Sequence, residues 1–113
     1  MSLLKHVAGR LRMLRPRSRE EIHAYWQGPD HENLAEGYLE GAERSRYLVG
    51  VLERHVGKDA SVLEIGCNVG RNLHFLLEAG WRDVAGVEIS EQAVELMKQA
   101  FPDVAERAAI HVG

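Results

Sequence analysis

The stretch Ser61-Val-Leu-Glu-Ile-Gly-Cys-Asn-Val-Gly-Arg-Asn72 decides the fold. Its first half is short, apolar and β-branched, which predicts a strand over 61–65 that is buried on both faces of a parallel sheet. Gly66 and Gly70 then predict a tight turn, and the apolar spacing that follows predicts a helix over 70–79 with a glycine stop after it. A strand, a glycine turn and a helix in this order bring bare backbone and a helix N-terminus close to a ligand.

The same alternation continues toward the C-terminus. A second apolar run predicts a strand over 83–88, and Glu88 places a carboxylate at the carboxyl end of that strand. Ser90 is the expected N-cap of a helix over 90–100, which a Phe-Pro pair then stops, and residues 108–112 predict a third strand. Short strands that alternate with helices are typical of an α/β fold.

The N-terminal part, 1–57, predicts helices only. Ser18-Arg-Glu-Glu21 has the form of a capping box, so a short helix is expected to run to about Trp26. A Gly-Pro-Asp break at 28–30 separates it from a long helix that we expect over about 33–57. We therefore divide the chain into a helical extension or lid over 1–57 and an α/β domain over 58–113.

Residues 1–19 hold six basic residues and no acid, and their apolar residues share one helical face. This pattern suits a helix on a membrane surface or an anionic partner, and also an organellar transit peptide. The interpretation we favour is a terminal helix that rests its apolar side on the domain. The pair Tyr25-Trp26 also has two interpretations, because it suits either closure over a ligand or ordinary packing.

Composition limits the function further. A chain of 113 residues that is 45% hydrophobic suits one domain with a modest core, and its formal charge of -3 argues against a nucleic-acid binder. A single cysteine, Cys67, excludes an internal disulfide and favours a reducing compartment, so we expect a cytoplasmic protein. No apolar run is long enough to span a bilayer, and no side-chain spacing matches a metal site.

Two common phosphate-binding loops do not fit the glycine turn. A P-loop needs G-x-x-x-x-G-K-[ST], and when it is counted from Gly66 its second glycine and its lysine fall at Arg71 and Asn72. The dinucleotide fingerprint needs glycine at the positions of Asn68 and Arg71, so NAD or FAD is a weak fit. What remains is E-x-G-x-N-x-G, with an acid at the end of the next strand.

In this form, the segments 62–73 and 84–90 resemble motif I and the strand-two acid of class I S-adenosylmethionine (SAM)-dependent methyltransferases. The resemblance covers about residues 58–113, and Asn68 replaces the usual middle glycine, which is tolerable because asparagine enters the left-handed region more easily than most residues. It implies the N-terminal portion of a Rossmann-like sheet, about three parallel strands preceded by a helical extension. The helix around Glu43-Arg44-Ser45-Arg46 is similar to the helical prelude of many members.

The resemblance also implies roles for individual residues in binding SAM. Gly66 and Gly70 let the main chain approach the methionine and ribose, Glu64 meets the ammonium group, and Glu88 accepts hydrogen bonds from the ribose hydroxyls. Ile89 packs on the adenine face. The expected cofactor-binding set is completed by three loop residues, Cys67, Asn68 and Asn72.

Methyl transfer asks mainly for alignment of the acceptor and exclusion of water, and no catalytic base stands out. His74 is expected to be exposed, His23 and His31 are weak candidates for the acceptor side, and Cys67 is expected to be inert. The family sheet has about seven strands, so we expect this chain to be the cofactor-binding part of a longer enzyme. Family strand order leaves strand one at an open edge, which predicts a homo-oligomer.

The sequence thus favours a SAM-dependent methyltransferase with a small-molecule acceptor. Two other functions stay open: a non-catalytic fragment for assembly or partner binding, and a Rossmann-type NAD-binding protein.

Overall fold

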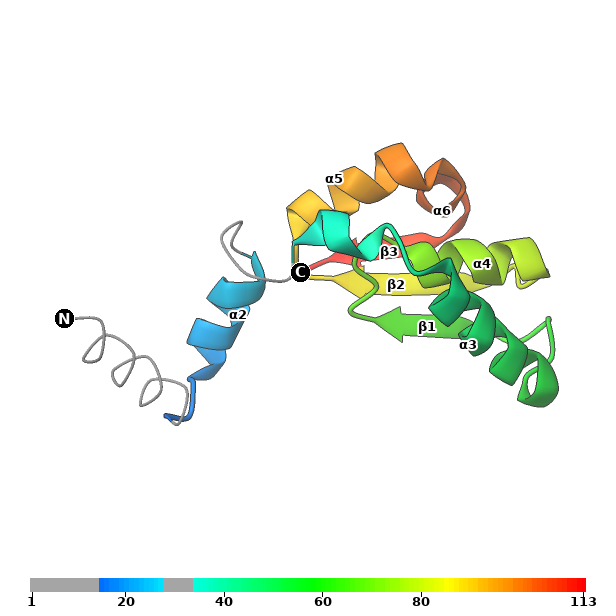
Figure 1. Ribbon diagram of the computed structural model, residues 1–113, viewed down its shortest axis with the longest axis horizontal. Helices are drawn as coiled ribbons and strands as arrows, with labels where there is room; N and C mark the ends of the chain where they lie inside the picture. Colours follow the sequence, from blue (N-terminus) through cyan, green and yellow to red (C-terminus); the bar gives the residue numbers. More distant parts are fainter. Residues whose placement is uncertain (1–14, 28–33) are drawn as a thin grey trace.

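The computed structural model describes residues 15–27 and 34–113 (Figure 1). Most of the basic segment 1–19, the break at 28–30 and His31 lie outside these ranges, so the predictions made for them stay untested.

Three parallel strands form one sheet in the order β1 (Val62–Ile65), β2 (Val84–Glu88) and β3 (Ala109–Val112). The registers place Leu63, Ala85 and Ala109 side by side across the sheet. This is the α/β architecture and the strand number that the sequence predicts, and β1 stands at an edge of the described sheet, as expected.

Helices make both crossovers between the parallel strands. Helix α4 (Arg71–Ala79) connects β1 to β2 and ends at Gly80, which is left-handed, as predicted. Helix α5 (Glu91–Ala100) begins at Ser90, whose hydroxyl oxygen accepts a hydrogen bond from the Ala93 N–H at 3.2 Å. A further helix, α6 (Pro102–Arg107), was not predicted: Pro102 ends α5 but starts α6, since a proline at the first helical position loses no hydrogen bond.

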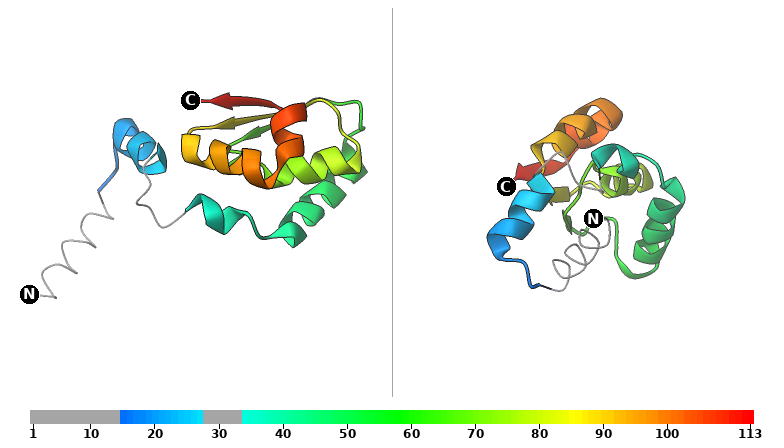
Figure 2. Two further views of the ribbon diagram at one scale, coloured as in Figure 1. Left: turned by 90° about the horizontal axis from the view of Figure 1, so that it is seen from above. Right: turned by 60° about the vertical axis from the view of Figure 1, so that its left-hand side comes forward.

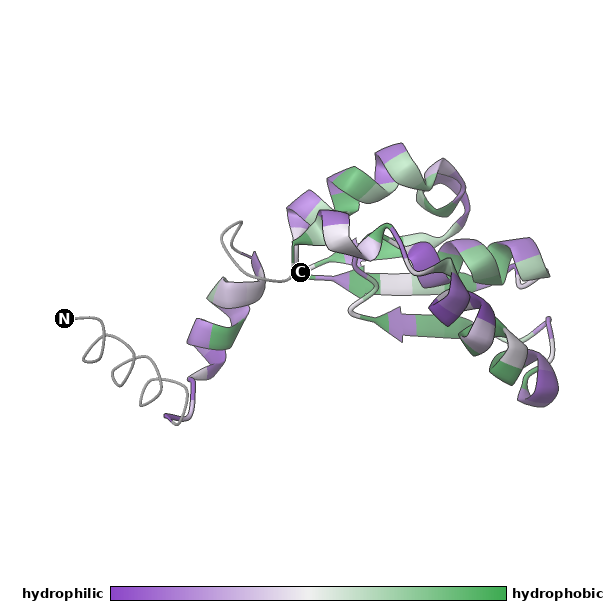
Figure 3. Ribbon diagram, viewed as in Figure 1, coloured by the Kyte–Doolittle hydropathy of each residue, from purple (hydrophilic) through white to green (hydrophobic). Residues whose placement is uncertain are grey.

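The helices cover only one face of the sheet within the described residues (Figure 2). The strands are largely hydrophobic (Figure 3), and on the covered side α4, α5 and α6 bury Trp81, Leu73 and Met97 completely. On the other side, Leu63 is 59% and Ile65 82% exposed. The prediction that the first strand is buried on both faces is therefore wrong for the described chain, because no described helix packs on that side.

The N-terminal helices differ in part from the prediction. Helix α2 (Arg19–Gln27) has the predicted capping box, in which the Glu21 N–H donates to the Ser18 hydroxyl and the Ser18 N–H donates to the Glu21 carboxylate. The expected long helix is instead a 3-10 turn, η1 (Ala35–Tyr38), followed by α3 (Ala42–His55). The break falls at Gly41, whose φ of 102° is left-handed and cannot continue a right-handed helix.

Helix α3 packs on α4, and its residue Val49 belongs to the same core cluster as Leu73 and Trp81. Helix α3 therefore shares the core of the α/β domain, whereas α2 buries no residue, and the domain boundary at 57/58 stays a prediction. None of the helices in the described ranges is long and apolar enough to cross a membrane.

Candidate functional site

A cavity of about 460 Å³ lies where β1 and β2 end, within the size range of small-molecule sites. It brings together all the sequence-predicted site residues except Gly70, together with side chains from α2, η1 and α4. Its lining consists of Trp26, Tyr38, Glu64, Gly66, Cys67, Asn68, Val69, Arg71, Asn72, Glu88 and Ile89.

The loop after β1 takes the turn that its glycines predict. Gly66, Asn68 and Gly70 have φ values of 75°, 51° and 79°, so asparagine does occupy the left-handed region at the middle position. A Cβ atom placed on Gly66 would meet no atom of the described chain within 4 Å, which leaves this stretch of backbone open. Gly70 lies deeper, where a Cβ atom would come within 3.0 Å of Met97 and 3.1 Å of Val104.

The same loop is held across the end of β2. The N–H groups of Gly66 and Cys67 both donate to the Val87 carbonyl, at 2.8 and 3.0 Å. The crossing is close because Gly86 has no side chain: a Cβ atom there would lie 2.6 Å from the Cys67 sulfur. Gly86 is therefore a residue of steric importance that the sequence analysis did not single out.

Glu88 is buried at the carboxyl end of β2, with 7% of its surface exposed. Its Oε2 accepts a hydrogen bond from the Asn68 N–H at 2.6 Å, and its Oε1 accepts from the N–H groups of Ile89 and Ser90 at 2.9 and 3.0 Å. These donors satisfy a charged group that would otherwise be costly to bury. They hold the carboxylate in one orientation.

Glu64 lies half-buried at the end of β1. The Asn72 side-chain amide donates to Glu64 Oε2 at 2.6 Å. Burial raises the pKa of the Glu64 carboxyl and the nearby Glu88 carboxylate raises it further, whereas the Asn72 hydrogen bond and the Arg71 charge oppose the rise. Two carboxylates thus share one cavity with a single guanidinium.

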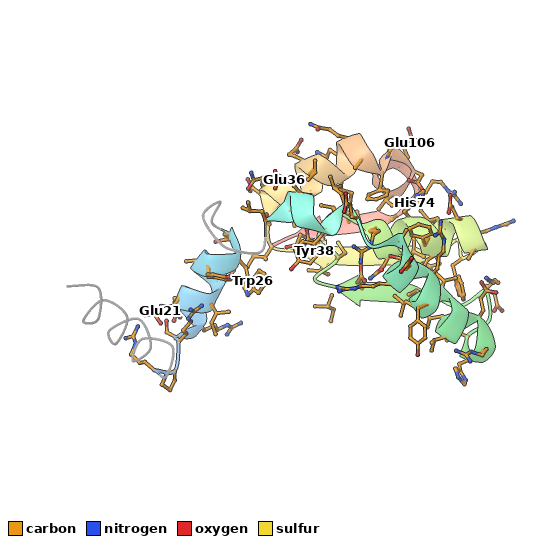
Figure 4. All side chains as sticks on the ribbon, viewed as in Figure 1. Glu21, Trp26, Glu36, Tyr38, His74 and Glu106 are labelled. Carbon is orange, nitrogen blue, oxygen red and sulfur yellow. The ribbon has the colours of Figure 1, made fainter. Side chains whose placement is uncertain are left out.

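Two aromatic side chains line the cavity. Trp26 comes from α2 and Tyr38 from η1, and both lie toward the end of the molecule where the strands terminate (Figure 4). Trp26 is 39% exposed. Trp26 thus lies where it could contact a ligand, and closure over a ligand stays a prediction.

The surroundings of Cys67 and His74 differ from each other. Burial and the two neighbouring carboxylates raise the pKa of the Cys67 thiol to about 12, so it stays protonated, in line with the expectation that it is inert. His74, labelled in Figure 4, was expected to be exposed, but its side chain is only 24% exposed. Asp103 of α6 lies 2.7 Å from His74 Nδ1. The described chain contains no cluster of three or more side chains that could hold a metal ion.

Sequence reasoning missed the roles of Arg71, which lines the cavity, and of Ser45, which lies behind it. Arg71 donates to the backbone carbonyls of Tyr38 and Glu40 and to the Ser45 hydroxyl. Ser45 is fully buried and donates to the Asn72 amide oxygen at 2.7 Å. The sequence places Ser45 within the predicted helical prelude but assigns it no role, since its partner Asn72 is 27 residues away.

The sequence matches no protein-family model and no curated protein, but the fold matches solved methyltransferase structures. One is magnesium protoporphyrin IX methyltransferase from Synechocystis PCC 6803 with bound S-adenosylhomocysteine (SAH). It has 17% identity and a TM-score of 0.63 over 85% of this chain and 51% of that chain. Another is the methyltransferase domain of bacterial CtHen1-C, with 24% identity and a TM-score of 0.53 over 64% of this chain and 40% of that one.

A third is an amino pentose methyltransferase of Micromonospora echinaspora with bound SAM, at 20% identity and a TM-score of 0.51 over 74% of this chain and 37% of that one. The chain thus spans about half or less of each of these structures. At these identities the likeness establishes the fold alone: the described chain has part of the Rossmann-like fold that these methyltransferase structures share.

Proposed function

We propose that this chain binds SAM in the cavity at the ends of β1 and β2 and forms the cofactor-binding part of a methyltransferase for a small-molecule acceptor. The observation that carries the proposal is the meeting of Glu64, Glu88 and the left-handed glycine loop in one cavity. SAM carries an ammonium group and ribose hydroxyls, and carboxylates suited to both line this cavity.

The two carboxylates suit a cationic ligand. The Glu88 carboxylate raises the pKa of Glu64, and a bound cation relieves that repulsion. In this proposal Glu64 holds the ammonium group through Oε1, which accepts no hydrogen bond from the described residues. Glu88 Oε2 has only the Asn68 N–H as a described partner, so it has room to accept a ribose hydroxyl.

The loop fits the rest of the cofactor. The open Gly66 backbone allows a ligand to come close without meeting a side chain. Asn68 Oδ1 is buried and has no partner within the described residues, and a buried acceptor of this kind is satisfied when a ligand donates to it. Ile89 supplies an apolar surface for the adenine ring.

When bound, SAM supplies an electrophilic methyl group, so the protein's task is to position the acceptor and exclude water. Trp26 and Tyr38 are placed for this task, because both rings line the cavity. Two of the solved structures are named for small-molecule acceptors, a porphyrin and an amino pentose, which supports the proposed acceptor class. Cys67 does not act as a base, because its pKa of about 12 keeps the thiol protonated.

Equilibrium titration calorimetry tests the proposal, with SAH and NADH as competing candidate ligands. We expect SAH to bind with one site per chain and NADH to show no saturable heat. Binding of NADH in preference to SAH would favour the Rossmann-type alternative, and absence of SAH binding would contradict the proposed function. Transfer of a radiolabelled methyl group from SAM to small-molecule acceptor candidates then tests activity.

A further inference from the structure

A directional chain of hydrogen bonds connects helix α3 to the Glu64 carboxylate. Arg71 Nε donates to Ser45 Oγ at 2.8 Å, Ser45 Oγ donates to Asn72 Oδ1 at 2.7 Å, and Asn72 Nδ2 donates to Glu64 Oε2 at 2.6 Å. A guanidinium can only donate and a carboxylate can only accept. These two ends therefore set the orientation of both the Ser45 hydroxyl and the Asn72 amide between them.

Ser45 is the member of this chain that does not line the cavity. It is 0% exposed and lies on α3, behind Arg71 and Asn72. Arg71 in turn donates to the backbone carbonyls of Tyr38, at 2.9 Å, and Glu40. Among the described residues of the N-terminal extension, Ser45 is the side chain whose hydrogen bond reaches Glu64 through Asn72.

We propose that Ser45 is a positioning residue for ammonium recognition, because it fixes the Asn72 amide so that Glu64 presents its free oxygen to the ligand. This inference rests on the proposed function. Hydrogen bonds that run in one direction from a cation to an anion polarise one another, so the bond from Asn72 to Glu64 is stronger than an isolated amide–carboxylate bond. Loss of the Ser45 hydroxyl leaves the Asn72 amide free to rotate and leaves Arg71 Nε without its acceptor.

The charge on Glu64 makes this role measurable. The titratable groups that face Glu64 are Arg71 from α4, Glu88 from β2 and Cys67 from the loop. The Asn72 hydrogen bond lowers the pKa of Glu64 against the effect of burial. A variant that loosens Asn72 therefore raises the pKa of Glu64 further, and the pH below which a cationic ligand loses affinity moves upward.

The test is titration of the full chain with SAH over a range of pH, for the wild type and for Ser45→Ala. We expect Ser45→Ala to weaken SAH binding by about fivefold, the effect of losing one hydrogen bond, and to shift the acidic limb of the affinity profile to higher pH. In a Glu64→Gln background, which has no titrating carboxyl at this position, Ser45→Ala should leave the affinity nearly unchanged. Such non-additivity between the effects of the two substitutions on SAH affinity would show that Ser45 acts through Glu64.

Val49→Ala is the matched control, because Val49 is buried on the same helix and makes no contact in the hydrogen-bond chain. We expect it to lower the melting temperature without moving the pH profile. If Ser45→Ala behaves like Val49→Ala, or weakens binding equally in both backgrounds, the positioning role is overturned.

Asn72→Ala covers the case in which Ser45→Ala does not fold, since Asn72 is only partly buried and its loss removes the same donor. It should reproduce the shifted pH profile, and an unshifted profile overturns the inference. A wild type that binds no SAH would overturn the proposed function and this inference with it. A wild type that binds SAH, with no effect of Ser45 or Asn72 on the profile, overturns this inference alone.

Discussion

The backbone N–H of Asn68 donates to Glu88 Oε2 at 2.6 Å, and this hydrogen bond joins the glycine loop after β1 to the acidic end of β2. The other oxygen of the same carboxylate accepts from the N–H groups of Ile89 and Ser90. Three backbone donors from two separate loops therefore converge on one buried side chain. The shape of the cavity depends on Glu88 whether or not a ligand is bound.

The first prediction follows from this arrangement and concerns Glu88→Ala. The change leaves three backbone N–H groups without their charged acceptor, so we expect the free energy of unfolding to fall by about 2–4 kcal/mol. SAH affinity should fall by about tenfold or more, because the ribose hydroxyl loses its acceptor. Urea denaturation and titration calorimetry measure the two effects separately.

Glu106→Ala is the control for this prediction, because Glu106 is exposed on α6 and points away from the cavity (Figure 4). It should change neither stability nor affinity by more than about 0.5 kcal/mol. Unchanged SAH affinity in Glu88→Ala would remove Glu88 from the proposed site.

The second prediction concerns the pH dependence that Glu64 imposes. Burial raises the pKa of Glu64 in the folded chain, so the folded state holds its proton more tightly than the unfolded state. The contribution of Glu64 to the free energy of unfolding is therefore largest below its usual pKa of 4.5. This contribution is lost as the pH rises through the raised pKa of the folded state. Glu64→Gln cannot ionise, so the variant does not lose stability as the pH rises. At neutral pH it should be as stable as the wild type or more stable.

The same Glu64→Gln variant should bind SAH about tenfold more weakly, because a neutral amide replaces the carboxylate that holds the ammonium group. Its side-chain oxygen still accepts from Asn72, so the loss of affinity reflects charge more than a rearranged site. Denaturation midpoints as a function of pH, together with SAH titrations, check both outcomes. A Glu64→Gln chain that is much less stable than the wild type at neutral pH would contradict the raised pKa of Glu64.

The third prediction tests the junction between η1 and α3. Gly41 is left-handed, and a Cβ atom there would lie 2.8 Å from Arg71 Nη1. Gly41→Ala should lower the free energy of unfolding by about 1–2 kcal/mol from backbone strain alone, and the displaced guanidinium should weaken SAH binding as well.

Gly50→Ala, within α3, is the control for Gly41→Ala, because it should raise the free energy of unfolding. Gly50 lies inside α3, and a Cβ atom there would meet nothing within 4 Å. This substitution should raise the free energy of unfolding by about 0.5–1 kcal/mol, because alanine has a higher helix propensity than glycine. Equal effects of the two substitutions in thermal denaturation would contradict the strain assigned to Gly41.

The fourth prediction concerns association through the edge strand β1 and the uncovered face of the sheet. Leu63 and Ile65 are exposed there beside Ala85 and Val87, so the isolated chain should self-associate. The double variant Leu63→Thr/Ile65→Thr keeps residues that favour strands and should shift the chain toward monomer in sedimentation velocity experiments. A stable wild-type monomer over the accessible concentration range would contradict this prediction.

Much of the local structure could be predicted because it depends on neighbours in the sequence. The Ser18 capping box, the Ser90 cap and the left-handed Asn68 each satisfy requirements within a few residues, and the structure contains all three. The predictions that were wrong or incomplete depend on distant partners. The long N-terminal helix breaks at Gly41 beside Arg71, and His74 is covered because α6 brings Asp103 to it.

The sequence by itself determined the three strands with the helices that begin after the first two, the glycine loop and the acids near the ends of these two strands, because periodicity and turn chemistry act over short distances. Only the tertiary structure decided which face of the sheet is covered, and only it linked Ser45 to Asn72 and Glu64. The physical reason is that a buried polar side chain must find its partner in space, and the separation of the two residues along the chain does not reveal that partner.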